Sequence, residues 1–124
     1  MSAEEFHPTY ITVKTDDDVS TVGFVISDLT DEENIELLGH ELFTLVDQLG
    51  CRKLILNMDK VRYMTSSVLG KLISLHRKLH RSEGQLIICN IGEELNQILS
   101  ASRLNQYFRL ADDLGAADEL MAAG

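Results

Sequence analysis

The sequence has few cysteines and prolines. The first shortage argues against a cysteine-based metal or redox site, and the second against a proline-rich linker between domains. Cys51 and Cys89 are the only cysteines among 124 residues, and their spacing matches neither a metal site nor a Cys-x-x-Cys redox motif. Pro8 is the single proline, and the eight glycines are scattered, so no linker composition divides the chain. We therefore expect one domain over residues 1–124, with residues 1–8 as a flexible N-terminal tail.

Long hydrophobic runs are also missing. No apolar stretch approaches the length of a membrane span, and the N-terminus does not read as a signal peptide. We therefore expect a cytoplasmic protein, in which a disulfide is disfavoured. Cys89 ends an apolar, strand-like run, so we expect it to be a buried, reduced thiol.

Positive charge is scarce overall and unevenly placed. Eleven lysines and arginines stand against twenty acids, giving a formal net charge of -9, which argues against nucleic-acid and anionic-membrane partners. Basic residues gather between residues 60 and 81. From this clustering we predict a positive helix face that steers an acidic partner or holds a phosphate, formed by Lys71, Arg77, Lys78 and Arg81.

Hydrophobic periodicity indicates alternating strands and helices. We expect the first helix to begin at a capping box, Thr30 to Glu33. The predicted order is β-β-α-β-α-β-α-β-α, an α/β fold whose mixed sheet of four to five strands has helices packed mainly on one face. Strands are expected at 10–14, 19–26, 53–57, 85–89 and 107–110, and helices after residues 30, 66, 92 and 113.

The sequence lacks the motifs of the common hydroxyl- and phosphate-based enzymes. Gly-x-Ser-x-Gly, a Walker loop and a glycine-rich phosphate cradle are all absent. His76 and His80 are four residues apart and could share a helix face as metal ligands, but Arg77 and Lys78 beside them would repel a cation. We therefore predict a protein that is not an enzyme, with no catalytic residue, metal or cofactor.

Two short segments have more than one interpretation. Leu104, Tyr107 and Phe108 form either an exposed docking patch or core packing, and we expect at least two of them in the core. The hydroxyl cluster Thr65-Ser66-Ser67 follows an apolar strand and opens an amphipathic helix. Such side chains cap the first turn of a helix, and the same place tolerates a phosphoryl group because of its free N–H donors and partial positive charge.

The stretch from Leu56 to Gly70, with Met64-Thr65-Ser66-Ser67-Val68-Leu69-Gly70 at its end, resembles the central segment of STAS domains. It is most similar to the bacterial anti-sigma factor antagonists, whose pattern there is Met-Asp-Ser-Ser-Gly-Leu-Gly. Ser66 aligns with the first serine of that pattern. Thr65 stands where the family has an acidic residue, and Val68 stands where it has glycine.

The resemblance implies a regulator that works by phosphorylation. In the family, the unphosphorylated protein binds an anti-sigma factor kinase and frees a sigma factor, and phosphorylation of the aligned serine ends that binding. Here the resemblance implies Ser66 as the phosphoacceptor, with Thr65 and Ser67 as alternates. The expected partner-binding residues are Asp28, Thr65, Ser67, Val68 and Leu69.

The expected partners are the anti-sigma factor serine kinase and, as a further candidate, a phosphatase, with the protein itself a monomer or weak homodimer. Two alternatives stay open. In one, the chain is a STAS scaffold or ligand-binding module whose hydroxyls only cap a helix. In the other, it is a small hydrolase that uses Ser66 or Ser67, although the sequence offers no evident base for it.

Overall fold

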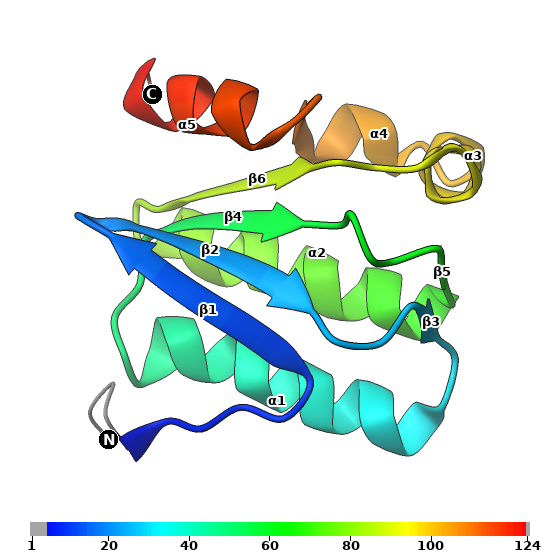
Figure 1. The fold of residues 1–124 in the computed structure, drawn as a ribbon, viewed down its shortest axis with the longest axis horizontal. Coiled ribbons are helices and arrows are strands. Elements are labelled where there is room, and N and C mark those ends of the chain that lie inside the picture. The colour runs from blue at the N-terminus through cyan, green and yellow to red at the C-terminus, as the bar shows by residue number, and fades with distance from the viewer. Residues whose placement is uncertain (1–4, 124) are drawn as a thin grey trace.

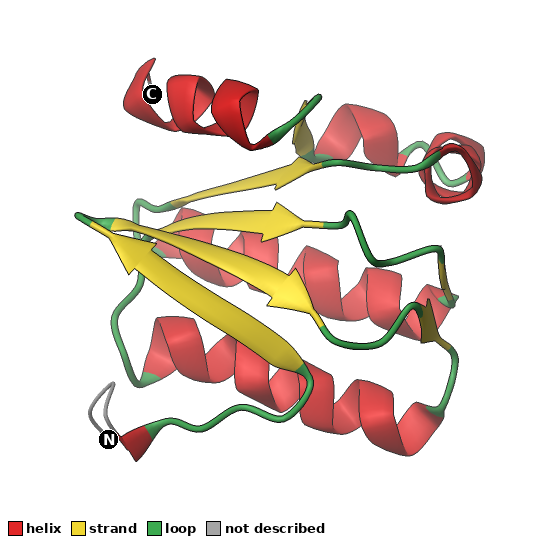
Figure 2. Ribbon diagram, in the orientation of Figure 1, coloured by secondary structure: helices red, strands yellow, loops and turns green. Residues whose placement is uncertain are grey.

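A five-stranded mixed sheet forms the centre of the computed structural model, which describes residues 5–123 (Figures 1 and 2). The strand order is β1-β2-β4-β6-β7. β1 is antiparallel to β2, and every other neighbouring pair is parallel. The strands are β1 Ile11–Asp16, β2 Val19–Phe24, β4 Lys53–Asn57, β6 Gln85–Cys89 and β7 Arg109–Ala111. The predicted mixed α/β fold is confirmed.

Helices cover both faces of this sheet unequally. The long helices α1 (Glu32–Asp47) and α2 (Ser66–Arg81) run beside each other under one face, and α3 (Glu93–Ala101) packs against the same core (Figure 1). Among the helices of the described residues, α5 (Leu114–Ala123) alone packs on the opposite face, against β4, β6 and β7. The helices therefore lie mainly on one face, as predicted.

Alternation along the central strands produces two separate cores. Leu54 and Leu56 point into the larger core under α1 and α2, while Ile55 between them points toward α5.

Cys89 belongs to the smaller core and is fully buried. Burial, followed by the nearby acids Asp113, Asp59 and Asp118, raises the pKa of the Cys89 thiol to about 11. The thiol is therefore protonated at neutral pH, as expected of a buried structural cysteine.

A second, two-stranded sheet was not predicted from the sequence. β3 (Asp28–Leu29) pairs in parallel with β5 (Tyr63–Met64), although 34 residues separate Asp28 from its partner. Strands of two residues have too few positions to show an alternating pattern. Their pairing connects the segment before α1 to the segment before α2.

The predicted starts of the first helix and of the last strand were wrong. Asp31 caps α1 in place of Thr30, since its Oδ1 accepts hydrogen bonds from the N–H groups of Glu33 and Asn34 at 3.0 and 3.2 Å. Tyr107 ends the short helix α4 (Leu104–Tyr107), and the last strand begins at Arg109. Leu114, the first residue of α5, is exposed.

The segment predicted as a flexible tail lies partly outside the described residues, which begin at residue 5. Phe6 is half-buried and packs against the larger core. Immediately after the segment, the Glu41 carboxylate of α1 accepts hydrogen bonds from the backbone N–H groups of Thr9 and Tyr10 at 2.6 and 2.8 Å. These bonds fasten the entry to β1 onto α1.

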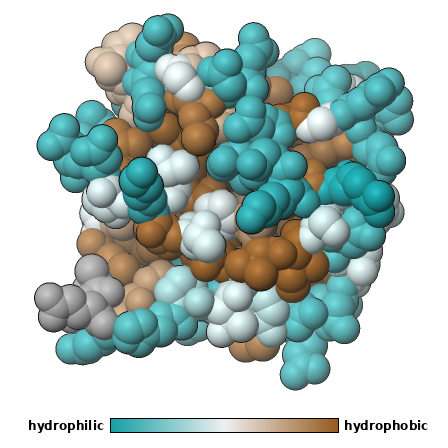
Figure 3. All heavy atoms as spheres, in the orientation of Figure 1, coloured by the Kyte–Doolittle hydropathy of each residue, from teal (hydrophilic) through white to brown (hydrophobic). Residues whose placement is uncertain are grey.

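The surface seen in Figure 3 alternates between hydrophilic and hydrophobic areas. The large apolar side chains that remain most exposed are Val25, Leu37, Tyr63, Tyr107 and Leu114. Among the helices of residues 5–123, none has both the length and the apolar character needed to cross a bilayer.

Candidate functional site at the N-terminus of helix α2

The start of α2 is fixed in place by the small β3–β5 sheet. The N–H groups of Arg62 and Tyr63 donate to the Ser27 carbonyl at 2.8 and 3.3 Å, and the Thr65 N–H donates to the Leu29 carbonyl at 3.3 Å. The Met64 side chain, 2 % exposed, anchors the segment in the core. These contacts hold the segment from which α2 begins at Ser66.

The three neighbouring hydroxyl groups have different surroundings. Thr65 is the N-cap residue, but its Oγ1 is buried, caps no N–H group and has no hydrogen-bond partner within residues 5–123. The Ser67 hydroxyl donates to Glu32 Oε1 at 3.0 Å. The side chain of Ser66, the first residue of α2, is exposed. Of the three, Ser66 is thus the most accessible to another protein.

The N-termini of α1 and α2 lie at the same end of the molecule because the two helices run in parallel (Figure 1). The first turn of α1 carries Glu32 and Glu33 and is capped by Asp31, so it is already supplied with acid groups. The first turn of α2 has neither a side-chain cap nor an acidic residue. Its N–H groups therefore have no side-chain acceptor and can bind an anion, with the Glu32 carboxylate of α1 as the nearby negative charge, 3.0 Å from the Ser67 hydroxyl.

An ion pair not foreseen from the sequence borders this site. Arg62 Nη2 lies 3.4 Å from Asp28 Oδ2, joining the residue before β5 to the first residue of β3. Both side chains are well exposed, at 70 % and 47 %. Asp28 was a predicted site residue, whereas Arg62 and Glu32 were missed because each lies more than thirty residues from its partner.

Two predicted partner-binding residues are not on the surface. Val68 is 1 % exposed and Leu69 is 8 % exposed, and both belong to the larger core. In this conformation they support the start of α2 from beneath. The branched side chain of Val68, which stands where the resembling family has glycine, is therefore accommodated inside the protein.

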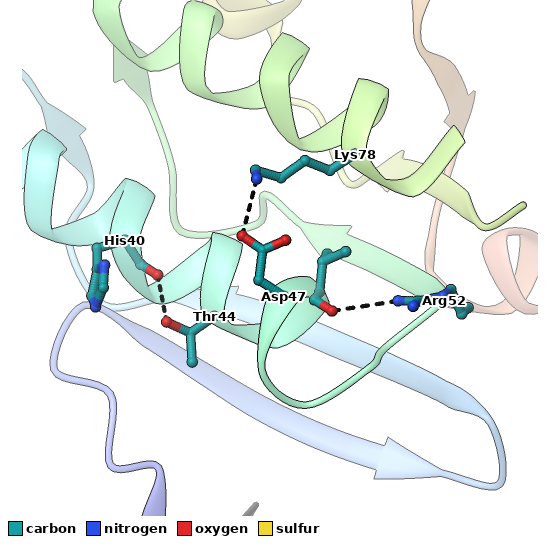
Figure 4. Close-up of polar contacts among 6 residues, drawn as sticks. His40, Thr44, Asp47, Arg52 and Lys78 are labelled. Carbon is teal, nitrogen blue, oxygen red and sulfur yellow. Dashed lines mark hydrogen bonds and ion pairs between the residues drawn. The ribbon is translucent and has the colours of Figure 1, made fainter. Parts of the chain in front are cut away.

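The predicted positive face of α2 is only partly formed. Lys71 pairs with Glu36 at 3.0 Å. Lys78 pairs with Asp47 at 2.9 Å (Figure 4), so acids of α1 neutralise both lysines. Figure 4 also shows the hydroxyl of Thr44 donating to the His40 carbonyl within α1. Arg77 and Arg81 are exposed and form no ion pair within the described part of the chain.

The histidines do not form a metal site in the part of the chain that the structure describes. No group of three or more potential metal ligands occurs within residues 5–123. His76 instead lies against aromatic rings, with its ring centroid 4.9 Å from Tyr107 and 6.0 Å from Phe108. Phe108 is buried and Leu104 packs against the larger core, which confirms the prediction that at least two of Leu104, Tyr107 and Phe108 are core residues.

Comparison with known proteins agrees with this architecture. The family model of the STAS domain matches residues 10–117. BtrV, a candidate anti-sigma factor antagonist of Bordetella bronchiseptica, is 26 % identical over 84 residues, which is 68 % of this chain and 72 % of that protein.

Solved structures with a similar fold include two anti-sigma factor antagonists or related regulators. An anti-sigma factor antagonist from Mycobacterium paratuberculosis has a TM-score of 0.78 and 20 % identity, covering 90 % of this chain and 92 % of its own. Phosphorylated SpoIIAA, a cell fate determinant of Bacillus, has a TM-score of 0.67 and 19 % identity, and the match covers 89 % of this chain and 98 % of the SpoIIAA chain. Because the STAS family model matches residues 10–117, which is most of this chain, the chain belongs to the STAS domain family.

Proposed function

We propose that this protein is an anti-sigma factor antagonist that is switched off by phosphorylation of Ser66. The unphosphorylated form binds an anti-sigma factor kinase in the cytoplasm and thereby frees a sigma factor. The observation that carries the proposal is the position of Ser66, an exposed hydroxyl on the first residue of α2. The likeness to BtrV and to the phosphorylated SpoIIAA structure supports it.

The surroundings of the three hydroxyls favour Ser66 over its neighbours as the phosphoacceptor. A kinase must place the acceptor oxygen in line with the γ-phosphate of ATP, which a buried oxygen such as Thr65 Oγ1 does not permit without local opening. Ser67 would first have to give up its hydrogen bond to Glu32. Ser66 requires neither change.

The switch we propose acts through local electrostatics. A phosphoserine carries about -1.5 to -2 charges at pH 7 and would stand at the N-terminus of α2, where the N–H groups and the helix dipole stabilise it. The fold can therefore remain unchanged while the surface around Ser66 becomes strongly negative. A partner surface that accommodates a neutral serine would then meet an unpaired charge, which costs binding free energy.

The partner surface we propose includes Asp28, Arg62 and Ser67 around Ser66. Asp28 and Arg62 form an exposed ion pair on the β3–β5 sheet, and the neighbouring Tyr63 is 44 % exposed. Arginine and tyrosine are residue types that recur at the energetic centres of protein interfaces. This sheet and the first turn of α2 thus offer a continuous docking surface.

The test compares the affinities of Ser66 variants for the proposed partner, an anti-sigma factor kinase, measured by calorimetry. Ser66→Ala is expected to bind like wild type, and Ser66→Asp is expected to bind at least tenfold more weakly, although one carboxylate supplies less charge than a phosphate. Ser74→Asp, which places the same charge on an exposed serine about two turns further along α2, is the matched control. Equal affinity of Ser66→Asp and wild type would favour the alternative, a STAS scaffold without a phospho-switch.

A further inference from the structure

The second half of α2 and the end of α4 enclose a shallow cleft with a volume of about 350 Å³. We call it the α2–α4 cleft, and its lining residues are His76, Arg77, His80, Arg81 and Tyr107. Ser66 lies ten residues before the first of these along α2, roughly 15 Å at the rise of an α-helix. The cleft is therefore separate from the Ser66 site.

Positive charge in this cleft is not neutralised by ion pairs with the residues that the structure describes. Arg77 and Arg81 are four residues apart, so their side chains are neighbours on one face of α2. Both are exposed, and neither takes part in an ion pair among residues 5–123. The lysines on the other side of the same helix are paired with α1, so the free positive charge of α2 is confined to this cleft.

Aromatic rings give the cleft an apolar floor. Tyr107 is 42 % exposed and packs edge-on against the buried Phe108, with 5.2 Å between ring centroids. His76 packs between Tyr107 and His80, with 6.2 Å to the nearly parallel ring of His80. Burial, and then the charge of His80, lowers the pKa of His76, so its ring is neutral at pH 7 and adds apolar surface rather than a further charge.

One polar atom in the cluster is also left without a partner. His76 Nδ1 is buried and has no hydrogen-bond partner within the described residues. A buried polar atom of this kind is costly unless a partner group satisfies it. The arrangement therefore combines two free guanidinium groups, an exposed tyrosine and an unsatisfied ring nitrogen.

The chemistry of the cleft points to one class of occupant. A nucleic acid or an anionic membrane extends over an area larger than this patch, so most of it would face the rest of a molecule with a net charge of -9 and be repelled. A short acidic segment can contact the patch alone. A small ligand is normally enclosed over most of its surface, but four of the five lining residues are exposed here. Arginine and tyrosine on an open surface are typical of protein recognition.

We propose that the α2–α4 cleft docks an acidic segment of a protein partner, with carboxylates on Arg77 and Arg81 and an apolar side chain against Tyr107. Paired guanidinium groups bind carboxylates in a bidentate fashion, which gives direction as well as affinity. The cleft operates independently of the phosphorylation state of Ser66, so the protein can hold one partner while the Ser66 site binds or releases another.

The probe is a synthetic ten-residue peptide in which glutamates alternate with leucine and phenylalanine, titrated into the ¹⁵N-labelled protein. We expect saturable shifts of the amide signals at residues 76–81 and 104–108. A peptide with lysine in place of every glutamate is expected to cause no shift there. The same titration with Ser66→Asp is expected to give an affinity within twofold of wild type, which separates this proposal from the one concerning Ser66.

Variants test the role of charge. Arg77→Glu/Arg81→Glu is expected to bind the acidic peptide at least tenfold more weakly than wild type. Lys14→Glu/Lys60→Glu reverses two exposed lysines outside the cleft and gives the same net charge, and its affinity is expected to change less than threefold. Arg77→Lys/Arg81→Lys keeps the charge and loses the bidentate geometry, so an intermediate loss is expected.

Three results would overturn the proposal. One is that the peptide binds elsewhere or does not bind. Another is that both double reversals weaken binding equally, which would show attraction to overall charge. The third is that inorganic phosphate alone produces the same saturable shifts as the peptide, which would make the cleft a small-anion site.

Discussion

At the scale of single residues, the buried hydroxyl of Thr65 is the least satisfied group near the candidate site. It lies at an N-cap position, where threonine normally accepts a hydrogen bond from the first turn, yet it accepts none. Because a buried polar group without a partner costs free energy, we expect the Thr65 hydroxyl to lower the stability of this region. Its role is better explained by filling space above the core than by capping.

Replacing Thr65 with valine tests this explanation. Thr65→Val keeps the shape and removes only the unsatisfied oxygen, so the free energy of unfolding in urea is expected to stay the same or to rise by up to about 1 kcal/mol. The control is Thr44→Val, since the Thr44 hydroxyl is buried and donates to the His40 carbonyl at 2.8 Å. That variant is expected to lose about 1 kcal/mol. A larger loss at Thr65 than at Thr44 would show that the Thr65 hydroxyl does cap α2.

At the scale of secondary-structure elements, the turn from α2 into β6 depends on a close approach of backbone. A side-chain carbon added at Gly84 would collide with the carbonyl oxygen of Arg52. That carbonyl is held there because it accepts a hydrogen bond from the Gln85 N–H at 2.7 Å. The pairing of β4 with β6 begins at this point, so the collision could not be relieved without shifting a central strand.

Gly84 in this turn and Gly70 near the start of α2 are expected to respond oppositely to replacement by alanine. Gly84→Ala should lower the free energy of unfolding by about 1–3 kcal/mol, because the added methyl group overpacks the turn. Gly70→Ala in the interior of α2, where an added carbon meets open space, should raise it by about 0.5–1 kcal/mol. Thermal or urea unfolding measures both. A stabilising Gly84→Ala would contradict the close approach of Gly84 to the Arg52 carbonyl.

The sequence predicted the elements that have several periodic positions, such as α1, α2 and the central strands. Lys53–Asn57 and Gln85–Cys89 were placed without error because each is a short apolar run between turn residues. The pairing of β3 with β5 could not be predicted, since it depends on contacts between segments far apart in the chain. Tyr107 was misassigned because β-prone residues such as tyrosine and phenylalanine also occur in a short helical turn when packing requires it.

The candidate site was predictable only in part for the same reason. The motif located Ser66 at the start of a helix, but motif reading does not distinguish an exposed hydroxyl from a buried one. The bonds of Glu32 to Ser67 and of Asp28 to Arg62 arise from tertiary structure. Burial of Val68 and Leu69 likewise follows from the way α2 lies on the sheet.

At the scale of the whole molecule, α2 carries two separate surfaces, one at its N-terminus and one along its second half, while α1 runs parallel to it. The N-terminus of α2 carries Ser66 beside the small β3–β5 sheet, and its second half forms the α2–α4 cleft. Between them, acids of α1 neutralise Lys71 and Lys78. A change of charge at Ser66 is therefore expected to alter one surface and leave the fold intact.

The most direct test of the central claim is to map the phosphate after incubation with the cognate kinase and ATP. We predict that tandem mass spectrometry finds one phosphate, on Ser66, and that Ser66→Ala remains unmodified although Thr65 and Ser67 are still present. The far-ultraviolet circular dichroism of the phosphorylated protein is expected to match that of the unmodified form. Phosphate on Thr65 or Ser67 while Ser66 stays unmodified, or no phosphate at all, would contradict the claim that Ser66 is the switch.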